Sequence, residues 1–329
     1  MSEAMKAYIY NGGGGPEVIE LTQRSIPEVS SGEVLIKVEA FGLNRADVQQ
    51  RKGVYPPPEG ASDIPGLEVA GTIAALGADV TEWRIGTRVA ALLAGGGYAE
   101  YVNVPVQLLM NIPQSLSTVE AAALPEVSAT VVSNLFMEGS LVVGQTVLIH
   151  GGAGGIGSMA IQLAKAAGAR VIVTASSAEK LEYCAQLGAD AGINYREEDF
   201  VQRAKELTKD RGVDLILDVI GAKYLESNIK ALAVGGRVVV IGLQGGAKGE
   251  LNLGMMLAKR ARVIATTLRS RPLLEKTEII KQTVARVLPL IDAGELSVNL
   301  SKSFEFSELT SAHEYFDSGS HTGKIVVKV

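Results

Sequence analysis

The pattern of apolar and polar positions along the chain changes near Leu116. Before that point, apolar residues alternate with polar ones or gather in short β-branched runs bounded by Gly or Pro, as is typical of strands. We predict strands over residues 5–10, 33–40, 69–76, 87–93 and 98–104. Short strands joined by glycine-rich turns favour a curled, barrel-like β domain.

After Leu116, helical and strand patterns alternate. Residues 119–124 are alanine-rich and helical, and Pro125 suits the first turn of a second helix that reaches Glu138. Strands are predicted further on over residues 146–149, 170–174, 191–193, 213–219, 237–241 and 262–267, with helices between them that include 178–187 and 198–209. Six strands joined by crossover helices build an α/β fold with a doubly wound parallel sheet.

The C-terminal part returns to mixed α and β character. A long helix is predicted over residues 272–293, followed by a short strand over 304–306, a helix from Leu309 and a closing strand over 323–329. We expect this part to rejoin the β domain, so that residues 1–124 and 268–329 form a catalytic domain and residues 125–267 an inserted cofactor domain. The cleft between the two domains is then the expected active site.

A glycine-rich turn follows the first strand of the predicted parallel sheet. Residues 151–157 read GGAGGIG and connect a β-branched strand to an amphipathic helix. Glycines let the backbone approach a pyrophosphate, and a helix start offers free N–H groups. A flexible glycine turn is the alternative, but the strand before and the apolar helix stripe after favour dinucleotide binding. The predicted cofactor contacts in this turn are Gly152, Gly154, Gly155, Ile156 and Gly157.

The end of the next strand indicates which dinucleotide binds. NAD-preferring sites carry a carboxylate there, whereas this chain has none and offers Ser177 and Lys180. A hydroxyl and an ammonium suit the 2′-phosphate of NADPH, and Tyr195 follows the third strand nearby. The alternative is an ordinary serine N-cap beside a solvated lysine. We expect NADPH.

Composition narrows the class of protein. The chain has 329 residues, 47% of them hydrophobic, and a formal net charge of −5. The mean hydropathy is +0.21. These values predict a compact protein with no nucleic-acid or membrane partner. Cys184 is the one cysteine, and the N-terminal residues show no signal-peptide pattern, so we expect a cytoplasmic protein.

The histidines and the cysteine do not form a metal-binding pattern. His150, His313 and His321 are widely separated, and His150 beside the glycine turn is expected to be structural or a cofactor neighbour. We therefore expect no metal. Without a Lewis acid, the favoured substrates are quinones and α,β-unsaturated carbonyls, whose own π-systems accept a hydride.

Several segments together resemble the zinc-free quinone oxidoreductases of the medium-chain dehydrogenase/reductase superfamily, and most of all the p53-inducible quinone oxidoreductase-like branch. These segments are residues 40–47, 53–58, 64–68, 144–165, 193–195 and 323–326. Against zinc-dependent relatives, Asn44 stands where a cysteine ligand would, Leu67 where a histidine would, and Glu126 near the third ligand. The chain departs from the family at Gly152, where Ser or Ala is preferred, and at Gly154, where this branch commonly has a serine.

The resemblance implies a Rossmann cofactor domain inserted in a GroES-like catalytic domain, NADPH-dependent quinone reduction, and a homodimer or a tetramer. Asn44 and Asp47 would organise the nicotinamide side of the site, and Tyr55 would line the quinone pocket. The remaining implied cofactor contacts are Thr130, Gly242, Leu243, Gln244 and Lys324. Residues 261–266 are our choice for the subunit contact.

Simpler roles stand beside these. Tyr55 precedes a run of prolines that stiffens its loop, so its ring and hydroxyl suit a flat quinone, but the ring can also just pack the loop. A structural role is favoured for Asp47. Thr130 can be a buried helix hydroxyl, and Lys324 a solvated strand lysine.

The leading hypothesis is therefore an NADPH-dependent quinone reductase that transfers a hydride to a small conjugated acceptor. An enoyl or enone reductase on the same scaffold is one alternative. A non-catalytic NADPH-binding protein is the other.

Lys180→Glu tests the coenzyme prediction. A carboxylate at this position repels a 2′-phosphate, so the preference for NADPH over NADH in kcat/KM should fall in the variant. An unchanged ratio would contradict the assignment of NADPH.

Overall fold

The computed structural model describes residues 4–329, and the chain divides into two compact units. Unit 1 comprises Met1–Ala129 and Leu268–Val329, and unit 2 is Thr130–Thr267. In the described part of the chain, no helix has both the length and the apolar character needed to cross a bilayer.

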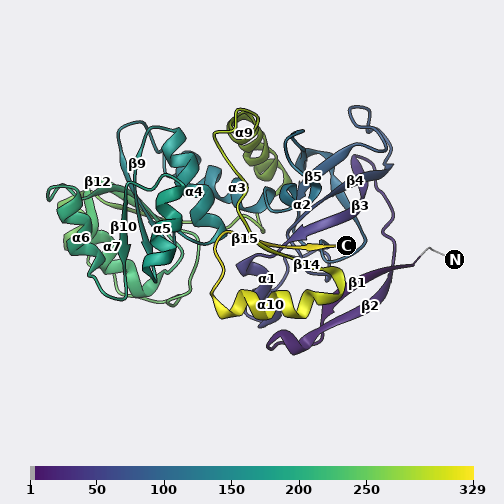
Figure 1. Ribbon diagram of the computed structural model, residues 1–329, viewed down its shortest axis with the longest axis horizontal. Helices are drawn as coiled ribbons and strands as arrows, with labels where there is room; N and C mark the ends of the chain where they lie inside the picture. The colour runs from purple at the N-terminus through teal and green to yellow at the C-terminus, as the bar shows by residue number, and fades with distance from the viewer. Residues whose placement is uncertain (1–3) are drawn as a thin grey trace. The chain divides into compact units, whose positions relative to one another are not determined.

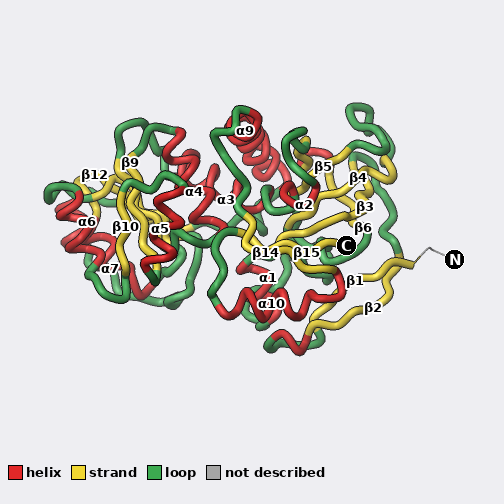
Figure 2. The backbone as a smooth tube through the Cα atoms, in the orientation of Figure 1, coloured by secondary structure: helices red, strands yellow, loops and turns green. Residues whose placement is uncertain are grey.

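Unit 2 is built on a six-stranded parallel sheet with helices on either side of it (Figures 1 and 2). Its strands are β8 (Thr146–His150), β9 (Arg170–Ala175), β10 (Ala191–Asn194), β11 (Val213–Asp218), β12 (Leu232–Val240) and β13 (Arg262–Ala265). The order β10-β9-β8-β11-β12-β13 reverses direction beside β8, which is the doubly wound arrangement. The predicted fold class is confirmed.

The helices of unit 2 follow its strands in alternation. They are α4 (Gly155–Ala166), α5 (Ala178–Gln186), α6 (Phe200–Leu207), α7 (Leu225–Ala231) and α8 (Leu253–Lys259). Helices on both faces bury the sheet, and Leu148, Ile172 and Ile216 are fully buried within one apolar cluster. Continuous apolar runs in β8, β9 and β11 therefore fit two-sided burial.

Unit 1 is mostly antiparallel sheet. Its strands are β1 (Ala4–Tyr10), β2 (Ile19–Ser25), β3 (Glu33–Gly42), β4 (Glu68–Leu76), β5 (Arg88–Leu92), β6 (Tyr101–Pro105), β7 (Leu109–Asn111), β14 (Leu300–Glu305) and β15 (Lys324–Lys328). β1 and β2 form a hairpin, and the others form one sheet in which β15 pairs with β3. Figure 1 shows this pairing as a yellow strand beside a purple one. The last strand of the chain thus lies against one of the first.

Unit 1 also contains helices. They are α1 (Arg45–Arg51), α2 (Thr118–Ala121), α9 (Leu273–Asp292) and α10 (Leu309–Ser318), while α3 (Pro125–Val131) begins in unit 1 and ends in unit 2. Pro125 occupies the first position of α3, as predicted.

Two elements lie outside the predictions, and two local predictions are corrected. Helix α1 has only seven residues and one buried apolar side chain, Val48, and strand β2 has no buried residue, so neither has a clear hydrophobic pattern. Tyr98 lies before β6 rather than in it, and its buried ring stacks on Phe41 at 4.5 Å. The helix predicted to reach Glu138 widens to a π-helix from Val132. Side chains of Ser133 and Asn134 donate to the carbonyl oxygen of Thr130, and this competes with the regular backbone ladder.

Candidate active site

Helix α4 begins directly after the glycine turn and leaves N–H groups without helical partners. Its N-cap, Gly154, has an extended backbone and no capping side chain. The first main-chain bond of the helix runs from the Ser158 N–H to the Gly154 carbonyl oxygen at 2.8 Å. The N–H groups of Gly155, Ile156 and Gly157 precede that bond, so they have no intrahelical acceptor. This end of α4 fits a pyrophosphate.

Close packing requires two of the three motif glycines. A Cβ at Gly157 would overlap the carbonyl oxygens of Gly151 and Gly152, and one at Gly152 would lie 2.8 Å from Cβ of Val173. A Cβ at Gly154 would meet only the Gly151 carbonyl oxygen, at 3.7 Å. At position 152, where the family prefers Ser or Ala, Val173 leaves no room for a side chain, which explains the glycine. At position 154, where the branch commonly has a serine, there is room for a side chain, so sterics do not explain the glycine.

The end of β9 carries the residues predicted to select NADPH. Ser177 caps α5, and its Oγ accepts a hydrogen bond from the Lys180 N–H at 3.3 Å. The serine is therefore an N-cap, and its hydroxyl proton still serves as a donor. Tyr195 follows β10 and is exposed. The 2′-phosphate role of Ser177, Lys180 and Tyr195 stays a prediction.

The loop after β12 lies against the loop after β11. The Gln244 N–H donates to the Val219 carbonyl oxygen at 3.2 Å, and a Cβ at Gly242 would lie 2.8 Å from that oxygen. Leu243 between them is exposed. Both loops leave the carboxyl edge of the parallel sheet, where the glycine turn also lies and where ligands of this fold bind. The cofactor roles of Gly242, Leu243, Gln244 and the buried Thr130 stay predictions.

His150 belongs to a buried polar chain under this edge. Its Nε2 lies 2.8 Å from Oδ1 of Asn228 and its Nδ1 lies 3.1 Å from Oγ1 of Thr174. Burial lowers the pKa of His150 to about 4, so the ring is neutral and its Nε2–H donates to Asn228. Asn228 in turn donates to Asp218, whose carboxylate accepts from the Ile220 and Gly221 N–H groups. His150 is structural, which is one of the two roles expected for it.

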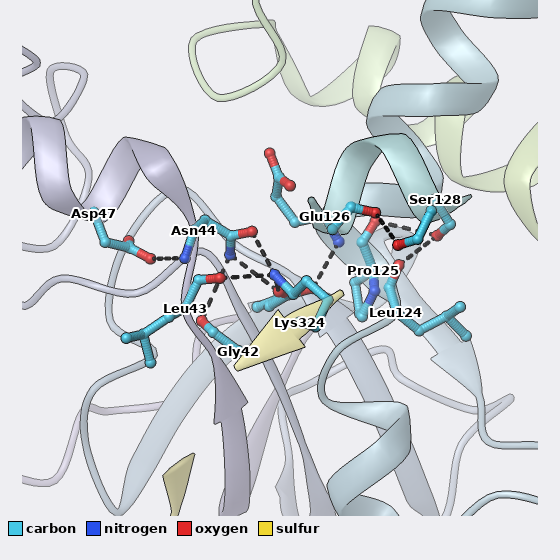
Figure 3. A network of polar contacts seen from close by, with 12 residues as sticks. Gly42, Leu43, Asn44, Asp47, Leu124, Pro125, Glu126, Ser128 and Lys324 are labelled. Atoms are coloured by element: carbon cyan, nitrogen blue, oxygen red, sulfur yellow. Dashed lines mark hydrogen bonds and ion pairs between the residues drawn. The ribbon is translucent and has the colours of Figure 1, made fainter. Parts of the chain in front are cut away.

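A second polar network lies in unit 1, where β15 meets β3 and β4 (Figure 3). The buried Lys324 ammonium donates to the Leu43 carbonyl oxygen at 2.9 Å, to Oδ1 of Asn44 at 2.6 Å and to Oε1 of Glu68 at 2.6 Å. Lys324 and Glu68 are an ion pair with almost no solvent exposure. All three donors of the ammonium are used here, so the lysine is not a solvated strand residue. Its role as a cofactor contact stays a prediction.

Asn44 is held at every polar atom of its side chain and at its main-chain N–H. Its Nδ2 donates to Oε1 of Glu68 at 3.0 Å, and its main-chain N–H donates to Oδ2 of Asp47 at 2.8 Å. Gly42 makes room for this set, because a Cβ there would overlap the Glu68 carboxylate. Asn44 thus fixes the start of α1, and Asp47 completes that start.

The residues that align with zinc ligands take part in packing and in hydrogen bonds within unit 1. Leu67 is a buried apolar residue, and the Glu126 N–H donates to Oε2 of Glu68 at 2.9 Å. Among residues 4–329, no group of three or more His, Cys, Asp or Glu side chains is placed to hold a metal ion. The positive charge beside Glu68 is instead the ammonium of Lys324.

Asp47 is fully buried, and Tyr98 is among the polar residues near it. Burial raises the pKa of Asp47 to about 6, against the opposing effects of the Asn44 N–H and Lys324. Nearby, Tyr98 Oη lies 3.2 Å from Nε2 of His313, and Nδ1 of His313 lies 3.0 Å from Nη1 of Arg51. An arginine only donates, so His313 accepts at Nδ1 and its Nε2–H donates to Tyr98. No local sequence pattern predicts this row of hydrogen bonds, because Arg51, Tyr98 and His313 are far apart in the sequence.

Tyr55 lies partly buried beside an arginine that the sequence did not indicate. The Arg269 guanidinium carbon is 5.6 Å from the centre of the Tyr55 ring. Burial raises the pKa of Tyr55, so its hydroxyl keeps its proton at neutral pH. In the sequence, Arg269 looks like any arginine after a strand, and only its burial distinguishes it.

Comparisons with known proteins agree with this arrangement. A family model described as "Zinc-binding dehydrogenase" matches residues 155–288, and one described as "Alcohol dehydrogenase GroES-like domain" matches residues 30–114. The quinone oxidoreductase of Homo sapiens is 31% identical over 317 residues, which is 95% of this chain and 94% of that protein.

Two solved structures are similar over nearly the whole chain. Quinone oxidoreductase of Pseudomonas syringae pv. tomato has a TM-score of 0.89 at 30% identity, covering 99% of this chain and 100% of that one. Quinone oxidoreductase of Escherichia coli, in complex with NADPH, has a TM-score of 0.88 at 29% identity, covering 98% and 100%. The chain belongs to the medium-chain dehydrogenase/reductase superfamily of oxidoreductases. Within that superfamily its relatives include the quinone oxidoreductases.

Two glycine substitutions test the packing of the turn. Gly152→Ala should lower the free energy of unfolding by about 1–3 kcal/mol, because its Cβ meets Val173. Gly154→Ser should leave stability unchanged or slightly higher, because the position has space and serine is a good N-cap. Urea unfolding of both variants measures this, and equal losses would contradict the packing argument.

Substitutions at the buried ion pair test its role in stability. Lys324→Met should destabilise the protein by about 3–5 kcal/mol, because it leaves the Glu68 carboxylate buried without its cation. The double variant Lys324→Met/Glu68→Gln should recover most of the loss. Lys328→Met, in the same strand but in an exposed pair with Glu305, is the control and should change stability by under about 1 kcal/mol. A Lys324→Met variant as stable as the control variant would refute the ion-pair role.

Proposed function

We propose that this protein is a zinc-independent, NADPH-dependent quinone reductase. The observation that carries the proposal is that the Lys324 ammonium donates hydrogen bonds to Asn44 and Glu68. Asn44 lies at the start of α1, in the segment that aligns with a zinc-ligand segment of related dehydrogenases. A leucine at position 67 offers no ligand atom, and the nearest oxygens already bind an ammonium. This donor set does not suit zinc, which takes three protein ligands in catalytic sites.

The residues of unit 2 fit NADPH. The free N–H groups at the start of α4 would hold the pyrophosphate, and Ser177 with Lys180 would hold the 2′-phosphate, with no carboxylate at the end of β9 to repel it. The NADPH complex of the Escherichia coli relative supports this assignment. When bound, NADPH supplies a hydride.

The residues of unit 1 fit a flat conjugated acceptor. Tyr55 presents an aromatic face and a protonated hydroxyl, and its proline-stiffened loop limits the motion of the ring. Asn44 and Asp47 fix the start of α1 in the same unit. With no metal to polarise the substrate, the acceptor must delocalise the incoming charge itself, as a quinone does.

We also propose that two copies of the chain pair along β13. This strand is the edge of its sheet, and Leu253 and Leu257 of the preceding helix α8 are exposed. An open strand edge beside exposed leucines favours association, and the molar mass in solution decides it.

A direct assay tests the proposed activity. Purified protein with NADPH and 9,10-phenanthrenequinone or 1,4-benzoquinone should consume NADPH well above the rate without enzyme. Crotonyl-CoA as the acceptor should give a lower kcat/KM. Faster turnover of crotonyl-CoA would favour an enoyl reductase, and tight NADPH binding with no turnover of any acceptor would favour a binding protein.

A further inference from the structure

Arg269 combines deep burial with an unsatisfied donor. The residue is 5% exposed, its Nε donates to the Ala94 carbonyl oxygen at 2.7 Å, and its Nη2 donates to Oε1 of Gln50 at 2.8 Å. Its Nη1 is buried and has no hydrogen-bond partner among the residues that the structure describes. A buried donor without an acceptor is costly, and native folds rarely keep one without a reason.

The unsatisfied edge of the guanidinium has a fixed direction. Gln50 on α1 and Ala94 after β5 hold the other two edges of the planar group. The main chain is held as well, because the buried Lys276 ammonium donates to the Arg269 carbonyl oxygen at 3.1 Å. A donor that cannot turn away is already oriented for a ligand.

The charges around this donor favour an oxygen that carries negative charge. Arg269 stays positive, and Lys276 adds a second positive charge to the same buried region. Burial lowers the pKa of Arg269, and Asp47 and the hydroxyl groups of Tyr55 and Tyr10 oppose this by raising it. Oδ2 of Asp47 accepts from the Asn44 N–H, while its Oδ1 is buried and has no hydrogen-bond partner among the described residues, so neither Asp47 oxygen bonds to Nη1. Neither tyrosine is ionised at neutral pH, because burial raises the pKa of both.

The ring of Tyr55 next to the guanidinium indicates the shape of that ligand. The two groups are 5.6 Å apart, and the loop that carries Tyr55 is followed directly by prolines. A flat conjugated molecule that lies against this ring can direct a ring oxygen towards Nη1.

We propose that Arg269 is the oxyanion-binding residue of the acceptor site, with Nη1 donating to the acceptor oxygen that becomes negatively charged on reduction. This inference rests on the proposed function. A hydride adds to one oxygen of the quinone and forms an O–H bond, the carbonyl π-electrons shift through the ring as it becomes aromatic, and the other oxygen takes the negative charge. A proton from solvent then completes the hydroquinone, so that NADPH, one proton and the quinone give NADP⁺ and the hydroquinone. Nη1 stabilises the charge between those two events.

The first experiment needs no turnover and uses 4-nitrophenol as a probe of the oxyanion site. The wild-type protein should bind the phenolate more tightly than the phenol, so that the bound probe ionises at a pH at least one unit below that of the free probe. Arg269→Gln should abolish this shift, and Arg269→Lys should retain part of it. Arg84→Gln, at an exposed arginine of the same unit, is the matched control and should keep the wild-type shift. No shift in the wild-type protein, or the same shift in Arg269→Gln, overturns the proposal.

The second experiment compares acceptors of graded basicity. Arg269→Gln should lower kcat/KM about 100-fold for 1,4-benzoquinone. The loss should be larger for methylated quinones, whose reduced oxygen is more basic, and smaller for chlorinated ones, while the Kd for NADPH stays unchanged. An equal loss for every quinone would indicate a merely structural role and overturn the proposal. If the wild-type protein reduces no quinone, the proposed function fails, and the nitrophenol titration still decides the role of Arg269.

Discussion

One buried ammonium joins the end of this chain to its beginning. Lys324 lies 280 residues after Asn44, yet its three donors are used by Leu43, Asn44 and Glu68. Because a buried charge without partners is very costly, β15, β3 and β4 have to assemble together. Asn44 then starts α1, and α1 carries both Asp47 and the Gln50 that orients Arg269. The proposed acceptor-binding residues of unit 1 therefore depend on the placement of this ammonium.

The proposed cofactor-binding residues of unit 2 depend on a steric constraint instead. Gly157 and Gly152 leave no room for a side chain, so the start of α4 comes close to the end of β8 and its first N–H groups stay free. The buried hydrogen bonds from His150 through Asn228 to the Asp218 carboxylate support the neighbouring loop, and the imidazole adds no charge there, because burial keeps it neutral.

Prediction from sequence succeeded where the signal was local and repeated. The six parallel strands and the glycine turn follow from periodicity and from residue types a few positions apart. It failed for α1, whose seven residues are mostly polar and whose start is stabilised by Glu68 and Lys324 from distant strands. Tyr98 is the first residue of the strand predicted over 98–104, whereas the structure places it before β6, as a core residue whose ring packs on Phe41.

The sequence by itself determined the fold class, the glycine-rich turn between β8 and α4 and the lack of a zinc-ligand pattern, because strand and helix periodicity and ligand types are properties of neighbouring residues. Only the tertiary structure decided what the polar residues do. It showed that Lys324 pairs with Glu68 and that Arg269 keeps an unsatisfied donor. The physical reason is that burial and hydrogen-bond partners arise when distant segments come together, and these set the charge, the pKa and the orientation of a side chain.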